Sequence, residues 1–238
     1  YTTKEILRIY KSNNKNVVAL GSTGISAVAL GGVSIHSFFK FGLCADFLEL
    51  KALDAKQKGK LKELFDIIKN IDLLIIDEIS MVSADLMEMI SLRLMQGGFK
   101  GRLMVVGDFY QLPPVKRQKD DMALIKFNYA FDSTAWYNFK FKNIELVISK
   151  RTSDVQFYSM LSRIRLGIID AEIYKKLSSK ITNEIAKDSV ILYGRNAEAD
   201  ALNAKKLAQI PNPLETISAS GRVYDETLQN DAYTKWIN

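Results

Sequence analysis

Short apolar runs that alternate with helical patterns constrain the fold of this chain more than any other feature of its sequence. The apolar runs predicted to form strands lie at 17–20, within LLIIDEIS at 73–80, at 102–106 and at 143–148. Helical patterns lie before and between them: at 3–10, at 25–30, along the lysine-rich stretch 50–70, and from an N-cap at Ser83 to the glycines at 97 and 98. Strands separated by helices predict an α/β fold with a parallel sheet covered on both faces.

The pattern of elements changes after about residue 150. Two helices are predicted at 154–166 and 170–179, and they are followed by a strand at 190–194 and a helix at 197–207. We therefore expect two domains, at 1–150 and 151–238, of which the second is partial.

The composition narrows the class of protein. A chain of 238 residues that is 47% hydrophobic and 25% charged can bury a substantial core, so it should be globular. Its net charge of +6 weakly favours an anionic partner such as nucleic acid. One cysteine, Cys44, excludes an internal disulfide, and with the single His36 it leaves no cluster for structural zinc. No stretch is long enough to span a membrane, so we expect a cytoplasmic protein, associated with the nucleoid if bacterial.

Two adjacent carboxylates, Asp77 and Glu78, directly follow four large apolar residues. Ionised carboxylates are costly to bury, so the pair implies a metal ion, a basic partner or an opening to water. In open parallel sheets, ligands bind beyond the carboxyl ends of the strands. We therefore expect the polar residues after three strands to converge there, namely 21–24, 77–78 and 107–111.

The chemistry of these strand ends suggests nucleotide hydrolysis. Asp77 can hold Mg²⁺ while Glu78 orients or deprotonates a water that attacks a phosphate. The alternative, about equally plausible for this pattern alone, is a strand end that merely meets solvent. In GDFYQLPPV at 107–115, Asp108 adds a third acid, and two prolines stiffen the loop that presents Gln111. An amide can sense a terminal phosphate or its attacking water, although a stiffened surface loop would look similar.

The sequence GSTG at 21–24 is not a phosphate loop of the G-x-x-x-x-G-K-[ST] type, because no lysine occurs between Lys15 and Lys40. Ser22, Thr23 and Gly24 can instead offer hydroxyl and backbone N–H groups to a nucleic-acid phosphate at the start of a helix. Simple N-capping of that helix is the competing interpretation.

Five segments in order resemble motifs of the Pif and RecD-like DNA helicases of superfamily 1, which unwind duplex DNA in the 5′-to-3′ direction. They are ALGSTGISAVALGGVSIHSFF, LLIIDEISMVSADLMEMI, VVGDFYQLPPV, FDSTAW and RTSDVQFYSMLSRIRLG. The resemblance implies a RecA-like P-loop NTPase sheet, part of a second RecA-like domain, and ATP with Mg²⁺ as cofactors. It also implies that a phosphate loop precedes Tyr1 and that further motifs follow in the second domain, so we expect little or no activity from these 238 residues alone.

The resemblance assigns roles around the nucleotide. Asp77 matches the Mg²⁺ ligand and Glu78 the catalytic glutamate. Asp108 is expected in the cofactor site from its place after a strand, not from the resemblance. Gln111 matches the amide that couples nucleotide state to movement. Arg151 matches the arginine that reaches the γ-phosphate, a bidentate phosphate partner.

The resemblance also assigns a path for single-stranded DNA. Ser22, Thr23, His36 and Ser37 match positions that line this path, and Phe38 is a candidate for stacking on a base. A structural role for His36 and core packing for Phe38 are the competing interpretations. Three basic residues are further candidate contacts, with a solvated basic loop as the default interpretation: Lys116, Arg117 and Lys119.

The expected partners are single-stranded DNA and junctions between single strand and duplex, with no membrane and no structural metal. We expect a monomeric helicase that acts in DNA repair and recombination. Two other functions remain open: a nucleotide hydrolase of DNA repair that separates no strands, and a DNA-binding module without catalysis.

Overall fold

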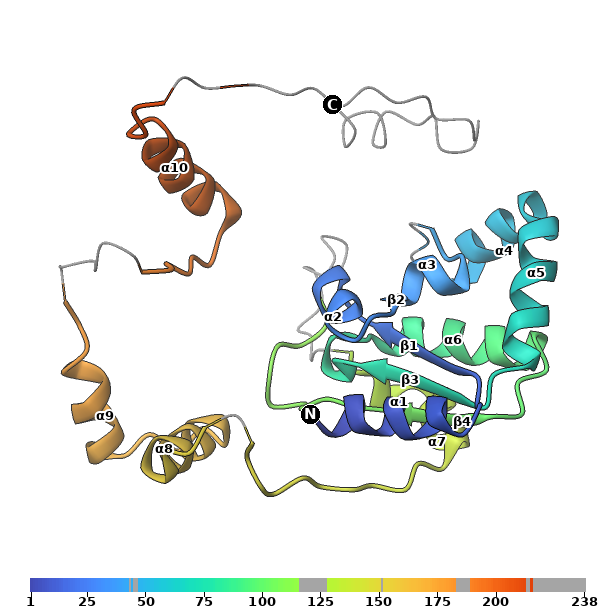
Figure 1. Ribbon diagram of the computed structural model, residues 1–238, viewed down its shortest axis with the longest axis horizontal. Coiled ribbons are helices and arrows are strands. Elements are labelled where there is room, and N and C mark those ends of the chain that lie inside the picture. Colours follow the sequence, from blue (N-terminus) through green and yellow to red (C-terminus); the bar gives the residue numbers. More distant parts are fainter. Residues whose placement is uncertain are drawn as a thin grey trace. The chain divides into compact units, whose positions relative to one another are not determined.

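The computed structural model describes residues 1–42, 44, 47–115, 128–150, 152–182, 189–212 and 215 (Figure 1). The chain divides into two compact units, Tyr1–Ser179 and Lys180–Asn238, which are described separately. Within the described ranges, no helix is long and apolar enough to cross a membrane. The domain boundary expected near residue 150 stays a prediction.

The first unit contains a sheet and most of the helices. Its strands are β1 (Val17–Gly21), β2 (Val33–Ser34), β3 (Leu73–Asp77) and β4 (Arg102–Val105). Its α-helices are α1 (Thr2–Ser12), α2 (Gly24–Ala29), α3 (Ile35–Phe39), α4 (Phe47–Lys56), α5 (Lys58–Lys69), α6 (Ala84–Gln96), α7 (Thr134–Phe139), α8 (Val155–Arg165) and α9 (Ala171–Ser178). The second unit contributes α10 (Asn196–Leu207).

All four strands run parallel in the order β2-β1-β3-β4, which confirms the predicted sheet. The predicted carboxyl ends of β1 and β4 are each within one residue of the observed ends. The strand β3 lies within the predicted stretch 73–80. In the register, Gly21 pairs with Asp77 and Ile76 pairs with Val105. The carboxyl ends of these strands therefore meet at one edge of the sheet.

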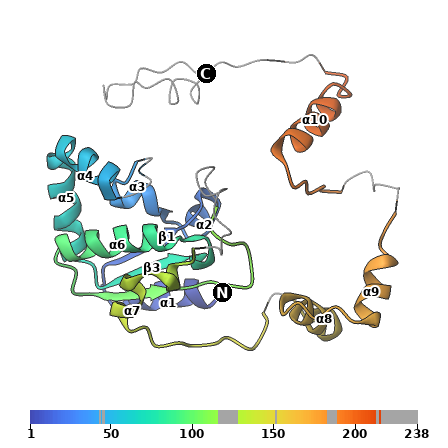
Figure 2. The same cartoon turned by 180° about the vertical axis from the view of Figure 1, so that it is seen from behind.

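The apolar run of β3 is explained by burial on both faces. Leu74 and Ile76 belong to the larger core cluster, which includes residues of α3, α5 and α6. Leu73 and Ile75 pack with Leu7 of α1 in the smaller cluster on the other face. Figure 1 shows α1 in front of the sheet, and Figure 2 shows α6 on the opposite side. Each fully buried side chain of this kind contributes about 1.5–3 kcal/mol, so β3 anchors the strand end that carries Asp77.

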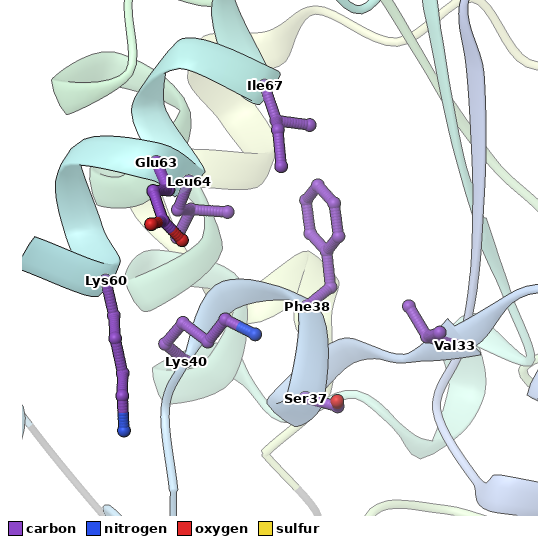
Figure 3. Close-up of a pocket in the computed structure, with 8 residues that line it drawn as sticks. All are labelled: Val33, Ser37, Phe38, Lys40, Lys60, Glu63, Leu64 and Ile67. Atoms are coloured by element: carbon purple, nitrogen blue, oxygen red, sulfur yellow. The ribbon is translucent and has the colours of Figure 1, made fainter.

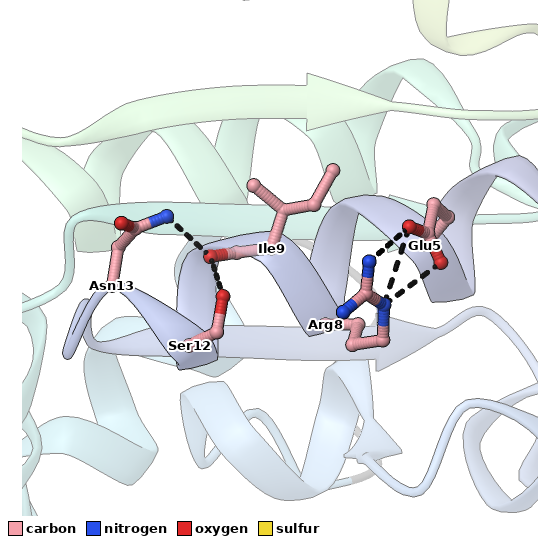
Figure 4. Close-up of polar contacts among 5 residues, drawn as sticks. All are labelled: Glu5, Arg8, Ile9, Ser12 and Asn13. Atoms are coloured by element: carbon pink, nitrogen blue, oxygen red, sulfur yellow. Dashed lines mark hydrogen bonds and ion pairs between the residues drawn. The ribbon is translucent and has the colours of Figure 1, made fainter.

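Local contacts complete α1, which was predicted at 3–10 (Figure 4). The guanidinium of Arg8 donates to Glu5 at 2.6–3.2 Å, and Ser12 Oγ and Asn13 Nδ2 donate to the carbonyl of Ile9 at 2.9 and 2.8 Å. The Ile9 carbonyl also accepts from the Asn13 backbone N–H at 3.2 Å, so three donors gather on one carbonyl at the end of the helix.

A buried arginine ties three helices together on the larger core side. Arg93 of α6 is 0% exposed, and its Nη1 and Nη2 donate to the two oxygens of Asp54 in α4 at 2.7 and 2.5 Å. Its Nε donates to the carbonyl of Phe39 at 3.1 Å, and Nη1 also donates to Gln96 at 3.1 Å. The guanidinium lies 5.6 Å from the centre of the Phe41 ring.

Most predicted helices are confirmed, with small changes of detail. The N-cap at Ser83 is confirmed, because its Oγ accepts from the Leu86 N–H at 3.2 Å. The lysine-rich stretch 50–70 forms two helices that break at Gln57, rather than one continuous segment. The short elements β2, α3 and α7 were not predicted.

Two predicted strands are wrong. Residues 143–148 and 190–194 pair with no strand in the part of the chain that the structure describes. Their apolar side chains lie in solvent: Ile144 is 78% exposed and Leu192 is 92% exposed. An apolar run needs a neighbouring strand to form a ladder, and the sequence of the run alone does not supply one.

Candidate functional site

Three loops meet at the carboxyl edge of the sheet, as the sequence predicted. The Ser22 N–H donates to the carbonyl of Asp77 at 3.4 Å, which joins the loop after β1 to the end of β3. The Ile79 N–H donates to the carbonyl of Val106 at 3.0 Å, which joins the loop after β3 to the residue beyond β4. The loops at 22–24, 77–79 and 106–111 therefore form one surface.

Glu78 has an unusual backbone conformation at this edge. Its φ of 54° and ψ of 48° lie in the left-handed region, which costs a residue with a Cβ about 1–2 kcal/mol. The conformation is held by the short 3-10 helix Ile79–Met81, whose first side chain is buried, and by close contact with Gly107. A Cβ on Gly107 would lie 2.8 Å from the Ile79 nitrogen. Such strained residues persist where the surroundings fix them, and they cluster at functional sites.

Asp77 and its neighbour Ser22 fit a hydrated magnesium ion. No group of three His, Cys, Asp or Glu side chains in the described ranges could enclose a metal. Mg²⁺ does not require one, because it keeps several waters and binds one or two carboxylates together with substrate phosphates. The Asp77 carboxylate is half-buried at the strand end, and the buried Ser22 Oγ has no hydrogen-bond partner among the described residues. Asp77 and Ser22 together therefore offer one carboxylate and one unsatisfied hydroxyl.

Asp108 is the centre of a second cluster. It accepts hydrogen bonds from Arg165 Nε at 2.7 Å, from the Tyr110 N–H at 3.1 Å and from Gln111 Nε2 at 3.2 Å. Burial raises the pKa of Asp108, but the hydrogen bonds from Arg165, Tyr110 and Gln111 and the charge of Arg165 outweigh this effect and lower the pKa below its ordinary value. The carboxylate is therefore ionised and acts only as an acceptor.

Thr23 caps α2, as the competing interpretation of its sequence proposed. Its Oγ1 accepts from the Ser26 N–H at 3.1 Å, and Ser26 Oγ accepts from the Thr23 N–H at 3.1 Å. This reciprocal pair is a capping box. A contact of Ser22 or Thr23 with DNA stays a prediction.

Ser37 and Phe38 line a groove of about 200 Å³ between α3 and α5 (Figure 3). Phe38 also packs edge-on against the buried Phe39, with ring centres 5.0 Å apart. His36 lies outside the groove, edge-on to Phe41 at 6.1 Å. The full lining combines apolar side chains with two lysines and one acid: Val33, Ser37, Phe38, Lys40, Lys60, Glu63, Leu64 and Ile67.

Sequence reasoning missed three cations that the structure places beside predicted residues. Lys40 and Lys60 share the groove of Phe38, and Arg165 contacts Asp108. Lys60 and Arg165 lie on helices that the sequence did predict, but no local signal indicates which lysine or arginine of a helix faces a distant loop.

Four residues with predicted roles lie outside the described residues. They are Lys116, Arg117, Lys119 and Arg151. Their roles stay predictions.

Comparison with known proteins places these features in a family context. The family model described as PIF1-like helicase matches residues 1–175. The ATP-dependent DNA helicase Pif1 of Campylobacter jejuni is 39% identical over 100% of this chain and 55% of its own length. The ATP-dependent DNA helicase PIF1 of Saccharomyces cerevisiae is 33% identical over 95% of this chain and 27% of its own. The chain thus spans about half of one curated relative and about a quarter of the other.

Solved structures agree on the fold. The crystal structure of Pif1 helicase from Candida albicans matches with a TM-score of 0.71 and 29% identity, over 87% of this chain and 48% of that one. A Bacteroides Pif1 helicase in complex with ADP-AlF3 and single-stranded DNA matches with a TM-score of 0.67 and 24% identity, over 84% and 48%. These likenesses confirm the predicted RecA-like architecture.

Proposed function

Because this chain belongs to the PIF1-like helicase family, we propose that the protein works as an ATP-dependent DNA helicase that moves 5′ to 3′ on single-stranded DNA and opens duplexes. The observation that carries this proposal is the strained Glu78 beside Asp77 at the edge where three strand-end loops meet. Backbone strain of this kind clusters at functional sites, and a carboxylate beside a metal ligand suits the activation of water.

The proposed hydrolysis assigns one task to each side chain of the edge. Asp77 binds Mg²⁺, which when bound neutralises charge on the phosphate oxygens of ATP. Glu78 orients the attacking water and accepts its proton. Gln111 contacts the γ-phosphate or the water, and Arg151 pairs with the γ-phosphate. Asp108 supports this group through its hydrogen bond with Gln111.

The test of this chemistry is Glu78→Gln in the full-length protein. Glutamine keeps the size and hydrogen-bonding reach of glutamate but cannot accept the proton, so ATP turnover should fall by about 10²-fold or more. Binding of a fluorescent ATP analogue should persist. Asp85→Asn, which changes an exposed carboxylate on α6, is the matched control and should keep its turnover. Unchanged turnover in the glutamine variant would remove Glu78 from the mechanism.

The groove of Phe38 is the proposed contact for single-stranded DNA. Its lining offers an aromatic ring for a base, together with Ser37 as a hydrogen-bond donor. Lys40 and Lys60 supply positive charge for the phosphates. Ser22 and Thr23 at the start of α2 are proposed as further contacts through their side chains, because their backbone N–H groups donate to Asp77 and Ser26. Such contacts bind DNA strongly, with marked dependence on salt and little dependence on sequence.

Binding of a fluorescent single strand at several salt concentrations tests the groove. Lys60→Ala should weaken binding and reduce the slope of log K against log salt by about 0.7, the value for one lost phosphate contact. Lys58→Ala, on the same helix but outside the lining, should leave the slope unchanged. Phe38→Ala should weaken binding by the equivalent of about 1–3 kcal/mol for one lost base stack. Equal behaviour of the two lysine variants would exclude the groove.

Strand separation needs its own assay. We expect the full-length protein to open a duplex with a 5′ single-stranded tail but not one with a 3′ tail. ATP turnover without strand opening would favour the alternative of a nucleotide hydrolase that separates no strands. Binding of DNA without any turnover would favour a non-catalytic module.

We further propose that the protein acts as a monomer in DNA repair and recombination, in the cytoplasm and on the nucleoid if it is bacterial. Light scattering during gel filtration, with and without DNA, measures the number of copies, and a dimer in both samples would contradict the proposed monomer.

A further inference from the structure

Arg165, in the last turn of α8, makes two contacts with the loop that carries Gln111. Its Nε donates to Asp108 Oδ2 at 2.7 Å, and its guanidinium lies 4.8 Å from the centre of the Tyr110 ring. An exposed ion pair by itself contributes little. Here one planar group engages both a carboxylate and an aromatic face, so the position of the arginine relative to this loop is fixed by two independent contacts.

This ion pair determines what Gln111 can offer to a substrate. The Asp108 carboxylate is ionised and can only accept hydrogen bonds, so the Gln111 amide must turn its Nε2 toward it. The carbonyl oxygen Oε1 then points away from Asp108 and remains able to accept a hydrogen bond from a water. Without a fixed carboxylate, the amide could turn over and present its N–H groups instead.

We propose that Arg165 is a positioning residue for ATP hydrolysis, which holds Asp108 in place and thereby sets the orientation of the Gln111 amide. The inference rests on the proposed function, because it assigns Gln111 a role at the γ-phosphate or its attacking water. Arg165 itself touches no reacting atom in this scheme. It acts through Asp108, and its loss should lower the rate of hydrolysis more than it changes the binding of ATP.

The chain offers a matched control on the same helix. Arg163 lies two residues before Arg165 on α8 and pairs with Asp170 and Glu172, not with Asp108. Arg165→Gln and Arg163→Gln therefore remove the same charge from α8, but only the first removes the contact with the Gln111 loop.

The experiment compares these two variants in the full-length protein by two measurements. Hydrogen exchange of the peptide 107–115 should become faster in Arg165→Gln and stay unchanged in Arg163→Gln. The DNA-stimulated kcat of Arg165→Gln should fall by about tenfold or more, with KM for ATP changed by less than about threefold, as expected for misplacement without lost binding. Arg165→Lys, which keeps the charge but not the planar stack, should recover part of the rate.

Further outcomes of these experiments test the role of Arg165 and keep it distinct from the proposed function. Asp108→Asn combined with Arg165→Gln should be no slower than Asp108→Asn alone, because Arg165 acts only through Asp108; a slower double variant would overturn this route. Unchanged exchange of 107–115 in Arg165→Gln, or a kcat equal to that of Arg163→Gln, would overturn the role of Arg165. A wild-type protein that hydrolyses no ATP would refute the proposed function, whereas the exchange experiment would still decide whether Arg165 holds the loop.

Discussion

Replacing Asp54 by alanine should destabilise the first unit by removing the partner of a buried charge. The Arg93 side chain is fully buried and makes four hydrogen bonds, two of them to Asp54. Removing one partner of a buried ion pair typically costs about 3–5 kcal/mol, because the other charge is left uncompensated. The cost exceeds the net value of the pair itself.

The structure favours the lower end of that range. Arg93 would keep its bonds to the Phe39 carbonyl and Gln96, and the Asp54 side chain is 21% exposed, so water can reach the vacated position. We expect a loss of about 3 kcal/mol in the free energy of unfolding. With a urea m-value of about 2 kcal/mol/M, the midpoint of unfolding should fall by about 1.5 M.

Urea unfolding followed by far-UV circular dichroism measures this loss. Asp66→Ala, which removes an exposed carboxylate from α5, should change the free energy by less than about 0.5 kcal/mol. Asp54→Leu combined with Arg93→Met should recover most of the lost stability, since apolar replacements of a buried pair are often neutral. A loss below about 1 kcal/mol in Asp54→Ala would show that Arg93 is not an uncompensated charge and would refute the reasoning.

Two further predictions concern the backbone conformation of Glu78 and the stability of the fold at low pH. Glu78→Gly should be more stable to urea than Glu78→Ala by about 1 kcal/mol, because alanine keeps a Cβ in the left-handed region; equal stabilities would argue against strain. The Asn16 N–H and Lys15 lower the pKa of Asp72, so its carboxylate stabilises the fold above the unfolded pKa, and this contribution disappears as the pH falls through the lower folded pKa. The stability gap between wild type and Asp72→Asn should therefore close in acid, and a constant gap would contradict the assignment.

The sheet was predictable because its information is local. β3 is recognisable in the sequence as an apolar run that ends in two acidic residues, and the capping side chain of Ser83 marks the start of α6. The strand predicted at 143–148 had the same apolar signal and is wrong, because the sequence carries the side-chain pattern but not the identity of a partner. The two-residue β2 was missed because it is too short to show any period.

The site was predictable only in part, for a related reason. The rule for parallel sheets brought Asp77, Glu78 and Gln111 to one edge without any knowledge of contacts. It could not reveal that Glu78 is left-handed, since that follows from the packing of Ile79 against Gly107. Nor could it reveal Arg165, which meets Asp108 across 57 positions of sequence.

The helix α2 packs directly against the end of β1, with no side chain between their backbones. A Cβ on Gly21 would lie 2.2 Å from the Ala27 nitrogen and 2.4 Å from Ser26 Oγ, so strand and helix touch backbone to backbone. The next residue, Ser22, is bonded through its N–H to the carbonyl of Asp77. A side chain between the two elements could change rotamer and absorb a small shift. Direct backbone contact leaves no such adjustment, so α2 must follow even a small displacement of the end of β1.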